Sequence, residues 1–200
     1  MGFCTGLNEH RISAQQKALA VSWHLQTSHS YQNMDFDPTC NYGDTDLTND
    51  DNLVRWKFGE LIKNLITLSS SADRQTEIIG IGAICDEMAI DFDTYFTLAY
   101  KSYLDNGLLT IDQFEILREL DIYFENRSGE KSPDFWDDFL LDTNPEWQIV
   151  RQKAKTILEL LKMQDLTIEF EREEKHEMTE KGRQIAMQLT KTRLVRQNAS

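Results

Sequence analysis

The side chains best able to interact with a charged ligand form an acidic cluster between residues 134 and 146. The acidic cluster consists of five acids and the tryptophan among them: Asp134, Trp136, Asp137, Asp138, Asp142 and Glu146. Asp134 follows Pro133 at an expected helix start, where a carboxylate is stabilised by the helix dipole. Asp138 and Asp142 lie one helical turn apart, and like charges at this spacing repel each other. The cluster therefore predicts a surface that binds a basic partner protein, with Trp136 either near that interface or in the core.

The acidic cluster belongs to a wider excess of negative charge. Residues 77–146 contain 17 acidic and four basic residues, so their net charge of −13 equals that of the whole 200-residue chain. Charge concentrated in this way creates a field that steers a basic partner, although a solvated face that keeps the protein soluble has the same composition. A general nucleic-acid binder needs a basic face, so we do not expect nucleic acid as a partner.

The remaining candidates give no expectation of a catalytic residue, a metal site or a cofactor. Four histidines are scattered, and the one Glu-x-x-His, at residues 173–176, lacks the second copy that a dimetal site in a helical bundle requires. Cys85 lies among apolar residues, as expected of a buried thiol. Asp44-Thr45-Asp46 lacks the later glycine and glutamate of a calcium loop. A carboxylate pair like that of a glycosidase is the enzymatic alternative, because spatial pairing of acids cannot be seen in a sequence.

Composition also bears on the compartment. Three cysteines do not support a disulfide framework and fit a reducing environment. The first ten residues show no secretory signal, and no apolar run approaches the 18 residues of a membrane span. We therefore expect a cytoplasmic protein that does not enter a membrane. The sequence allows a homo-oligomer but does not require one.

Hydrophobic spacing predicts a mainly α-helical fold, a bundle of five or six helices with a short C-terminal strand-plus-helix appendage. The expected organisation is an N-terminal helical arm (1–27), an acidic linker (28–51), a helical body (52–163) and the C-terminal appendage (164–200). The linker contains six aspartates and no lysine or arginine, so we expect it to be mobile or to be ordered only by a partner.

Several local signals place the helices of the body. Thr110 and Gln113 have the spacing of a capping box. Ser132-Pro133 and Asn144-Pro145 each combine a capping side chain with a proline suited to the first helical position. Residues 78–89 are apolar apart from Asp86 and Glu87 and predict one buried helix, with a strand as the alternative. The strongest helical stripe consists of Trp147, Val150, Ala154, Ile157, Leu158 and Leu161.

The appendage is expected to change from strand to helix. Leu166, Ile168 and Phe170 alternate with polar residues, which is typical of a strand. After Met178-Thr179 the chain is expected to form a helix that contains Ile185, Met187 and Leu189.

Several motifs of residues 52–163 follow one another in a recognisable order. They are Leu117-Arg118-Glu119-Leu120-Asp121, Ser128-Gly129-Glu130, Phe135-Trp136-Asp137 and Asn144-Pro145-Glu146-Trp147-Gln148-Ile149-Val150-Arg151-Gln152-Lys153-Ala154. In this order, a helix, a glycine-centred break, a Trp-Asp turn and a Trp-x-x-Val-Arg helix start, the chain resembles small helical immunity proteins of bacterial toxin–immunity pairs. The resemblance covers about half the chain and implies an acidic protein that binds and neutralises a basic toxin.

A shorter resemblance lies in residues 158–189. Ile168-Glu169-Phe170-Glu171 and Met178-Thr179-Glu180-Lys181-Gly182-Arg183 are similar to the wing and closing helix of bacterial winged-helix regulators, with Met178 where leucine is usual. This similarity implies DNA binding. The acids at residues 134–142 would then face phosphates, which is electrostatically unfavourable. An immunity-like binding protein is therefore the first functional hypothesis, a winged-helix regulator the second, and an enzyme with a carboxylate-based site the third.

Overall fold

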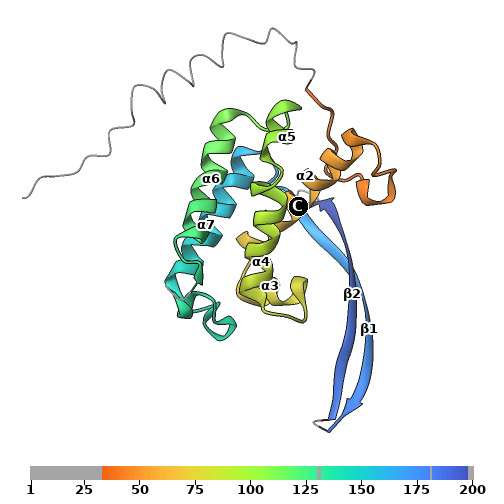
Figure 1. Cartoon of the computed structure of the whole chain (residues 1–200), viewed down its shortest axis with the longest axis vertical. Coiled ribbons are helices and arrows are strands. Elements are labelled where there is room, and N and C mark those ends of the chain that lie inside the picture. Colours follow the sequence, from red (N-terminus) through yellow and green to blue (C-terminus); the bar gives the residue numbers. More distant parts are fainter. Residues whose placement is uncertain (1–32, 130–131, 181, 198–200) are drawn as a thin grey trace, which may run out of the picture. The chain divides into compact units, whose positions relative to one another are not determined.

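A computed structural model describes residues 33–129, 132–180 and 182–197 of the chain (Figure 1). The chain divides into two units, residues 1–32 and 33–200, and all of the described residues belong to the second unit. The predicted N-terminal helical arm lies outside the described residues.

The described part of the chain is mainly α-helical and ends in two antiparallel strands. Its helices are α2 (Asp50–Ser69), α3 (Ala72–Ile79), α4 (Ile84–Phe92), α5 (Tyr100–Asp105), α6 (Ile111–Glu125) and α7 (Pro145–Leu160). A π-helical turn, η2 (Asp93–Thr97), joins α4 to α5, and short 3-10 turns lie at η1 (Tyr42–Asp44), η4 (Pro133–Phe135) and η5 (Asp138–Leu140). The strands are β1 (Leu166–Thr179) and β2 (Gly182–Arg196). The prediction of a mainly α-helical fold with a C-terminal strand appendage is confirmed.

Two helix starts form as their local sequence predicts. The side chain of Thr110 accepts a hydrogen bond from the Gln113 N–H, and the side chain of Gln113 accepts one from the Thr110 N–H, so the capping box of α6 is complete. The side chain of Asn144 caps α7 by accepting from the Glu146 N–H at 2.9 Å, with Pro145 in the first position. The third predicted start, Ser132-Pro133, leads only into the 3-10 turn η4.

The core lies between α2, α7 and the aromatic side chains of α4, η2 and α6. α2 and α7 pack closely against each other, and the predicted stripe of α7 is buried from Trp147 to Leu161. Trp147 stacks on Phe135 with ring centroids 4.8 Å apart, and its indole N–H donates to the Phe135 carbonyl at 2.6 Å. This contact ties the irregular segment before α7 to the core, although the segment has almost no regular structure of its own.

Residues 78–89 form two helices rather than the one helix predicted. α3 ends at Ile79, and Gly80 and Gly82 both take positive φ angles, +87° and +129°, before α4 begins at Ile84. A backbone in this region favours glycine, and it cannot continue a right-handed helix. The apolar composition that suggested one buried helix instead reflects two helix ends that both face the core.

The C-terminal appendage is a β-hairpin, so the predicted helix over Ile185, Met187 and Leu189 is wrong. β1 and β2 pair from Leu166 opposite Arg196 to Thr179 opposite Gly182, with one irregularity between Lys175 and His176. Tertiary pairing outweighs the local sequence here, because β2 satisfies its backbone hydrogen bonds against β1 and buries Leu194 beside Ile168.

The described part of the expected linker, residues 33–51, forms a series of short turns that lead into α2, and the mobility expected of it stays a prediction. Asp37 and Asp46 each accept hydrogen bonds from the residues two positions later, Thr39 and Thr48, which forms tight local turns. Phe36 packs edge-on against Phe58 of α2, with ring centroids 5.0 Å apart. The aspartates therefore stabilise turns, and one aromatic side chain anchors the segment.

Candidate functional site

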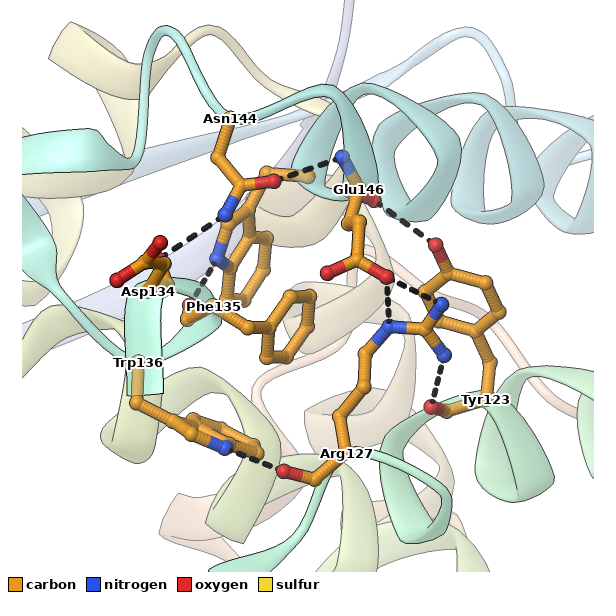
Figure 2. Close-up of polar contacts among 8 residues, drawn as sticks. Tyr123, Arg127, Asp134, Phe135, Trp136, Asn144 and Glu146 are labelled. Carbon is orange, nitrogen blue, oxygen red and sulfur yellow. Dashed lines mark hydrogen bonds and ion pairs between the residues drawn. The ribbon is translucent and has the colours of Figure 1, made fainter. Parts of the chain in front are cut away.

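The six residues of the predicted acidic cluster lie in the segment between α6 and α7 and in the first turn of α7, but they have different roles. Asp134, Asp137 and Asp142 are exposed, whereas Trp136, Asp138 and Glu146 are half-buried. Figure 2 shows that Trp136 and Glu146 both reach Arg127, two residues after the end of α6, from different sides.

Glu146 is engaged in an ion pair within the protein. Its Oε1 accepts from Nε and Nη2 of Arg127 at 2.8 and 2.6 Å, and the guanidinium also donates to the Tyr123 carbonyl (Figure 2). The same guanidinium lies over the Tyr123 ring, 3.4 Å from its centroid. This pair joins the C-terminal end of α6 to the first turn of α7, so Glu146 contributes to the fold more than to a free acidic surface.

Asp138 caps α4 from outside that helix. Its two carboxylate oxygens accept from the N–H groups of Ile84 and Cys85 at 3.0 and 2.9 Å. The residue at the N-cap position of α4 is Ala83, whose side chain has no acceptor, so Asp138 replaces the missing cap and compensates the helix dipole.

The Asp138 contact also affects Cys85. Burial, together with the Asp138 carboxylate, raises the pKa of the Cys85 thiol far above its ordinary value. A thiol with a raised pKa is a poor nucleophile at neutral pH. The side chain is fully buried, as the sequence predicted, and its environment argues against Cys85 as a nucleophile.

The indole of Trp136 contacts the protein interior on one side and a surface cleft on the other. Its N–H donates to the Arg127 carbonyl at 2.7 Å, and its ring meets Phe135 edge-on at 4.8 Å between centroids. The other side of Trp136 lines a surface cleft.

This acidic cleft has a volume of about 740 Å³ and is formed by α4, η2, α6 and the loop after α6. Its carboxylates come from Asp86, Asp93, Asp121 and Glu125, and no lysine or arginine is present among the described residues that line it. Three of these carboxylates are exposed, and the fourth, Asp121, accepts a hydrogen bond from the Thr97 hydroxyl at 2.9 Å. Phe92 and Phe124 add apolar surface next to Trp136.

The acidic cluster meets the cleft at the start of α4. Asp138 contacts the first turn of α4, and Asp86, one residue after Cys85, lines the cleft, so the two acidic regions adjoin at this helix end. Asp137 accepts from the N–H of Phe139, whose side chain is 96 % exposed. Phe139 is the most exposed large apolar side chain among the described residues.

Sequence reasoning identified the acidic region but missed the four carboxylates of the cleft, three of which are exposed. Asp86 and Asp93 lie seven residues apart, about two helical turns, and Asp121 and Glu125 lie four apart on α6. This helical spacing was a usable signal that each pair shares a face. That the two faces line one cleft follows only from the tertiary structure, in which η2 contacts both α4 and α6.

The described residues contain no group of three or more His, Cys, Asp or Glu side chains arranged to hold a metal ion. Among the described helices, none is both long and apolar enough to cross a membrane.

Comparisons with known proteins find no matching family model, no matching curated protein and no matching solved structure.

Proposed function

We propose that this chain binds a basic partner protein and that the acidic cleft is its docking site. The observation that carries the proposal is the set of four carboxylates around one cleft that has no lysine or arginine among its described lining residues. An arginine or lysine of a partner would form charge-assisted hydrogen bonds with these carboxylates. The face of Trp136 would add a cation–π contact.

The residues of the acidic cluster divide into two groups with different roles. Asp138 and Glu146 stabilise the fold, whereas Asp134, Asp137 and Asp142 contribute charge at the edge of the docking surface. Rim charges act mainly on the association rate, and desolvated charge pairs act mainly on the dissociation rate. Phe139 supplies an exposed aromatic anchor of the kind that often dominates binding energy.

The expected partner is a basic toxin that this chain would neutralise, as the resemblance to helical immunity proteins implies. A protein that covers a cationic nuclease site needs a concentrated negative surface and no enzymatic chemistry of its own. The charge concentration in residues 77–146 and the acidic cleft agree with that requirement.

The DNA-binding alternative has weaker support. β2 occupies the place of the closing helix on which the similarity to winged-helix regulators depended. Two of the basic side chains of β2, Arg193 and Arg196, form ion pairs with Glu169 and Asp165. Charges neutralised in this way are less available for phosphates.

The test compares partner binding by two double variants of equal charge change. Asp93→Lys with Glu125→Lys alters the cleft, and Glu159→Lys with Glu171→Lys alters exposed acids outside it. A partner is first identified by affinity purification from the source cells with all three proteins in parallel, and its affinity is then measured with purified components at several salt concentrations.

We expect the cleft variant to bind at least about tenfold more weakly and the control variant to bind within about twofold of the parent. The affinity of the parent should also fall as the salt concentration rises. Equal affinities of the cleft variant and the parent at every salt concentration would show that the cleft is not the docking site.

A further inference from the structure

A second, smaller pocket lies between the helices and the base of the hairpin. Its volume is about 310 Å³, and its walls come from α2, the end of α3, α4, η2 and both strands. Its polar lining includes Glu60, Lys63, Asn64, Glu87 and Asp91, whereas Ile78, Ile81 and Ile168 provide apolar walls. The acidic cleft and this pocket share no lining residue.

Asn64 gives the first sign that the pocket has an occupant. The residue is only 5 % exposed, and its Nδ2 donates to the Met88 carbonyl at 2.9 Å. Its Oδ1 is buried and has no hydrogen-bond partner among the described residues. A buried acceptor without a donor costs about 1–3 kcal/mol, so an unsatisfied group at a pocket wall points to a ligand that supplies the donor.

The charges that line the pocket indicate the sign of the charge on that ligand. Burial, followed by the charges of Glu87 and Glu60, raises the pKa of the Asp91 carboxyl to about 6. Lys63 is the one cation among the described lining residues, and its ammonium already contacts Glu60 at 2.8 Å and the Thr192 carbonyl at 3.1 Å. Three carboxylates therefore face the space with one engaged cation, so the pocket favours positive charge.

We infer that this pocket binds a small organic cation, an ammonium or guanidinium group, between the Glu87 and Asp91 carboxylates and the Oδ1 of Asn64. Glu87 and Asp91 lie one turn apart on α4, so both can accept from a single group with several N–H donors. The isoleucine walls would cover the alkyl chain of such a ligand. The inference is independent of the proposed docking of a basic protein at the acidic cleft.

The test uses n-butylammonium as the probe and 1-butanol as its neutral counterpart, with NMR titration of the full chain. We expect a saturable shift of the Asn64 side-chain amide and of the α4 amides around Glu87 and Asp91. The dissociation constant should lie in the millimolar range that suits a ligand with five heavy atoms, and 1-butanol should cause no comparable shift.

Two variants of similar charge change locate the site. Asp91→Asn removes one counter-ion of the pocket and should weaken butylammonium binding at least about tenfold. Glu125→Gln changes the acidic cleft instead and should leave the affinity within about twofold. Asp91→Asn removes a carboxylate that burial disfavours, so this variant is expected to fold.

The pH dependence gives an independent check. Asp91 is ionised above pH 6 and protonated below it, while the probe stays charged, so binding should weaken as the pH falls from 8 to 5. The titratable groups that face Asp91 are Glu87 on its own helix, Glu60 and Lys63 on α2, and Tyr95 on η2. The hairpin adds only Ile168, Thr190 and Thr192 to the described lining.

A blocked lysine, Nα-acetyl-lysine amide, distinguishes the two sources of the cation. Binding of butylammonium alone would assign the pocket to a free amine, and equal binding of the blocked lysine would assign it to a side chain of another protein. The inference is overturned if no saturable shift appears up to about 100 mM butylammonium, far above the expected dissociation constant. Equal binding of 1-butanol, or of the parent and Asp91→Asn, would also overturn it.

Discussion

Asp138 fixes the start of α4 from a position 54 residues away from Ile84 along the chain. A carboxylate that accepts two backbone N–H groups satisfies donors that α4 cannot satisfy by itself. The residue thus couples the irregular segment before α7 to a helix that forms one wall of the acidic cleft.

Replacement of this carboxylate should destabilise the protein. We expect Asp138→Ala to lower the free energy of unfolding by about 1–2 kcal/mol, because two half-buried N–H groups lose a charged acceptor. Asp137→Ala is the matched control, since its side chain is exposed and, among the described residues, accepts only from Phe139, and it should change stability by less than about 0.5 kcal/mol. Urea unfolding measures both values, and equal stabilities of the two variants would contradict the capping role.

Among the elements, the break between α3 and α4 depends on backbone conformation. Gly80 has a φ of +87°, and a Cβ at this position would lie 2.3 Å from Nε2 of Gln188 on β2. That amide donates to the Ile79 carbonyl at 3.0 Å, so it helps to join the end of α3 to the hairpin. The glycine is required for the turn, and a Cβ at this position would also force the Gln188 side chain to move.

Two alanine substitutions test this requirement, and they should change the free energy of unfolding in opposite directions. Gly80→Ala should lower the free energy of unfolding by at least about 1 kcal/mol, because of the positive φ and the collision with Gln188. Gly59→Ala lies within α2, where a Cβ would meet nothing within 4 Å, and should raise the free energy by about 0.5–1 kcal/mol. Thermal unfolding should show the opposite shifts in Tm, and a stabilised Gly80→Ala would refute this account of the turn.

At the scale of the whole molecule, Arg172 joins the hairpin to the helices. Nη2 of Arg172 on β1 donates to the carbonyls of Glu77 and Ile78 at 2.7 and 2.9 Å, at the C-terminal end of α3. A cation at this helix end also complements the dipole. The same guanidinium lies 5.0 Å from the centroid of the Phe170 ring.

Loss of Arg172 should loosen the hairpin without unfolding the helices. We expect Arg172→Ala to lower the free energy of unfolding by about 1–3 kcal/mol and to speed amide hydrogen exchange in β1 and β2 more than in α6 or α7. Arg193→Ala removes an exposed ion pair with Glu169 on the same hairpin and should cost less than about 1 kcal/mol. Equal exchange rates in both variants would show that Arg172 is not the anchor.

The sequence alone determined the features that depend on neighbours three or four residues apart. The capping box of Thr110 and Gln113, the Asn144-Pro145 start and the buried stripe of α7 were all predicted, because their signals are local. The strand of β1 followed in the same way from the alternation at Leu166 and Ile168. The concentration of acids in residues 77–146 could likewise be counted directly.

Only the tertiary structure decided which of those acids are available. Asp138 and Glu146 looked no different from Asp137 in sequence, yet one caps a distant helix and the other pairs with Arg127. The acidic cleft requires two helix faces to meet, and β2 became a strand because β1 lies beside it. These outcomes depend on contacts between residues far apart in the chain, whose energies exceed local preference and leave no periodic pattern in the sequence.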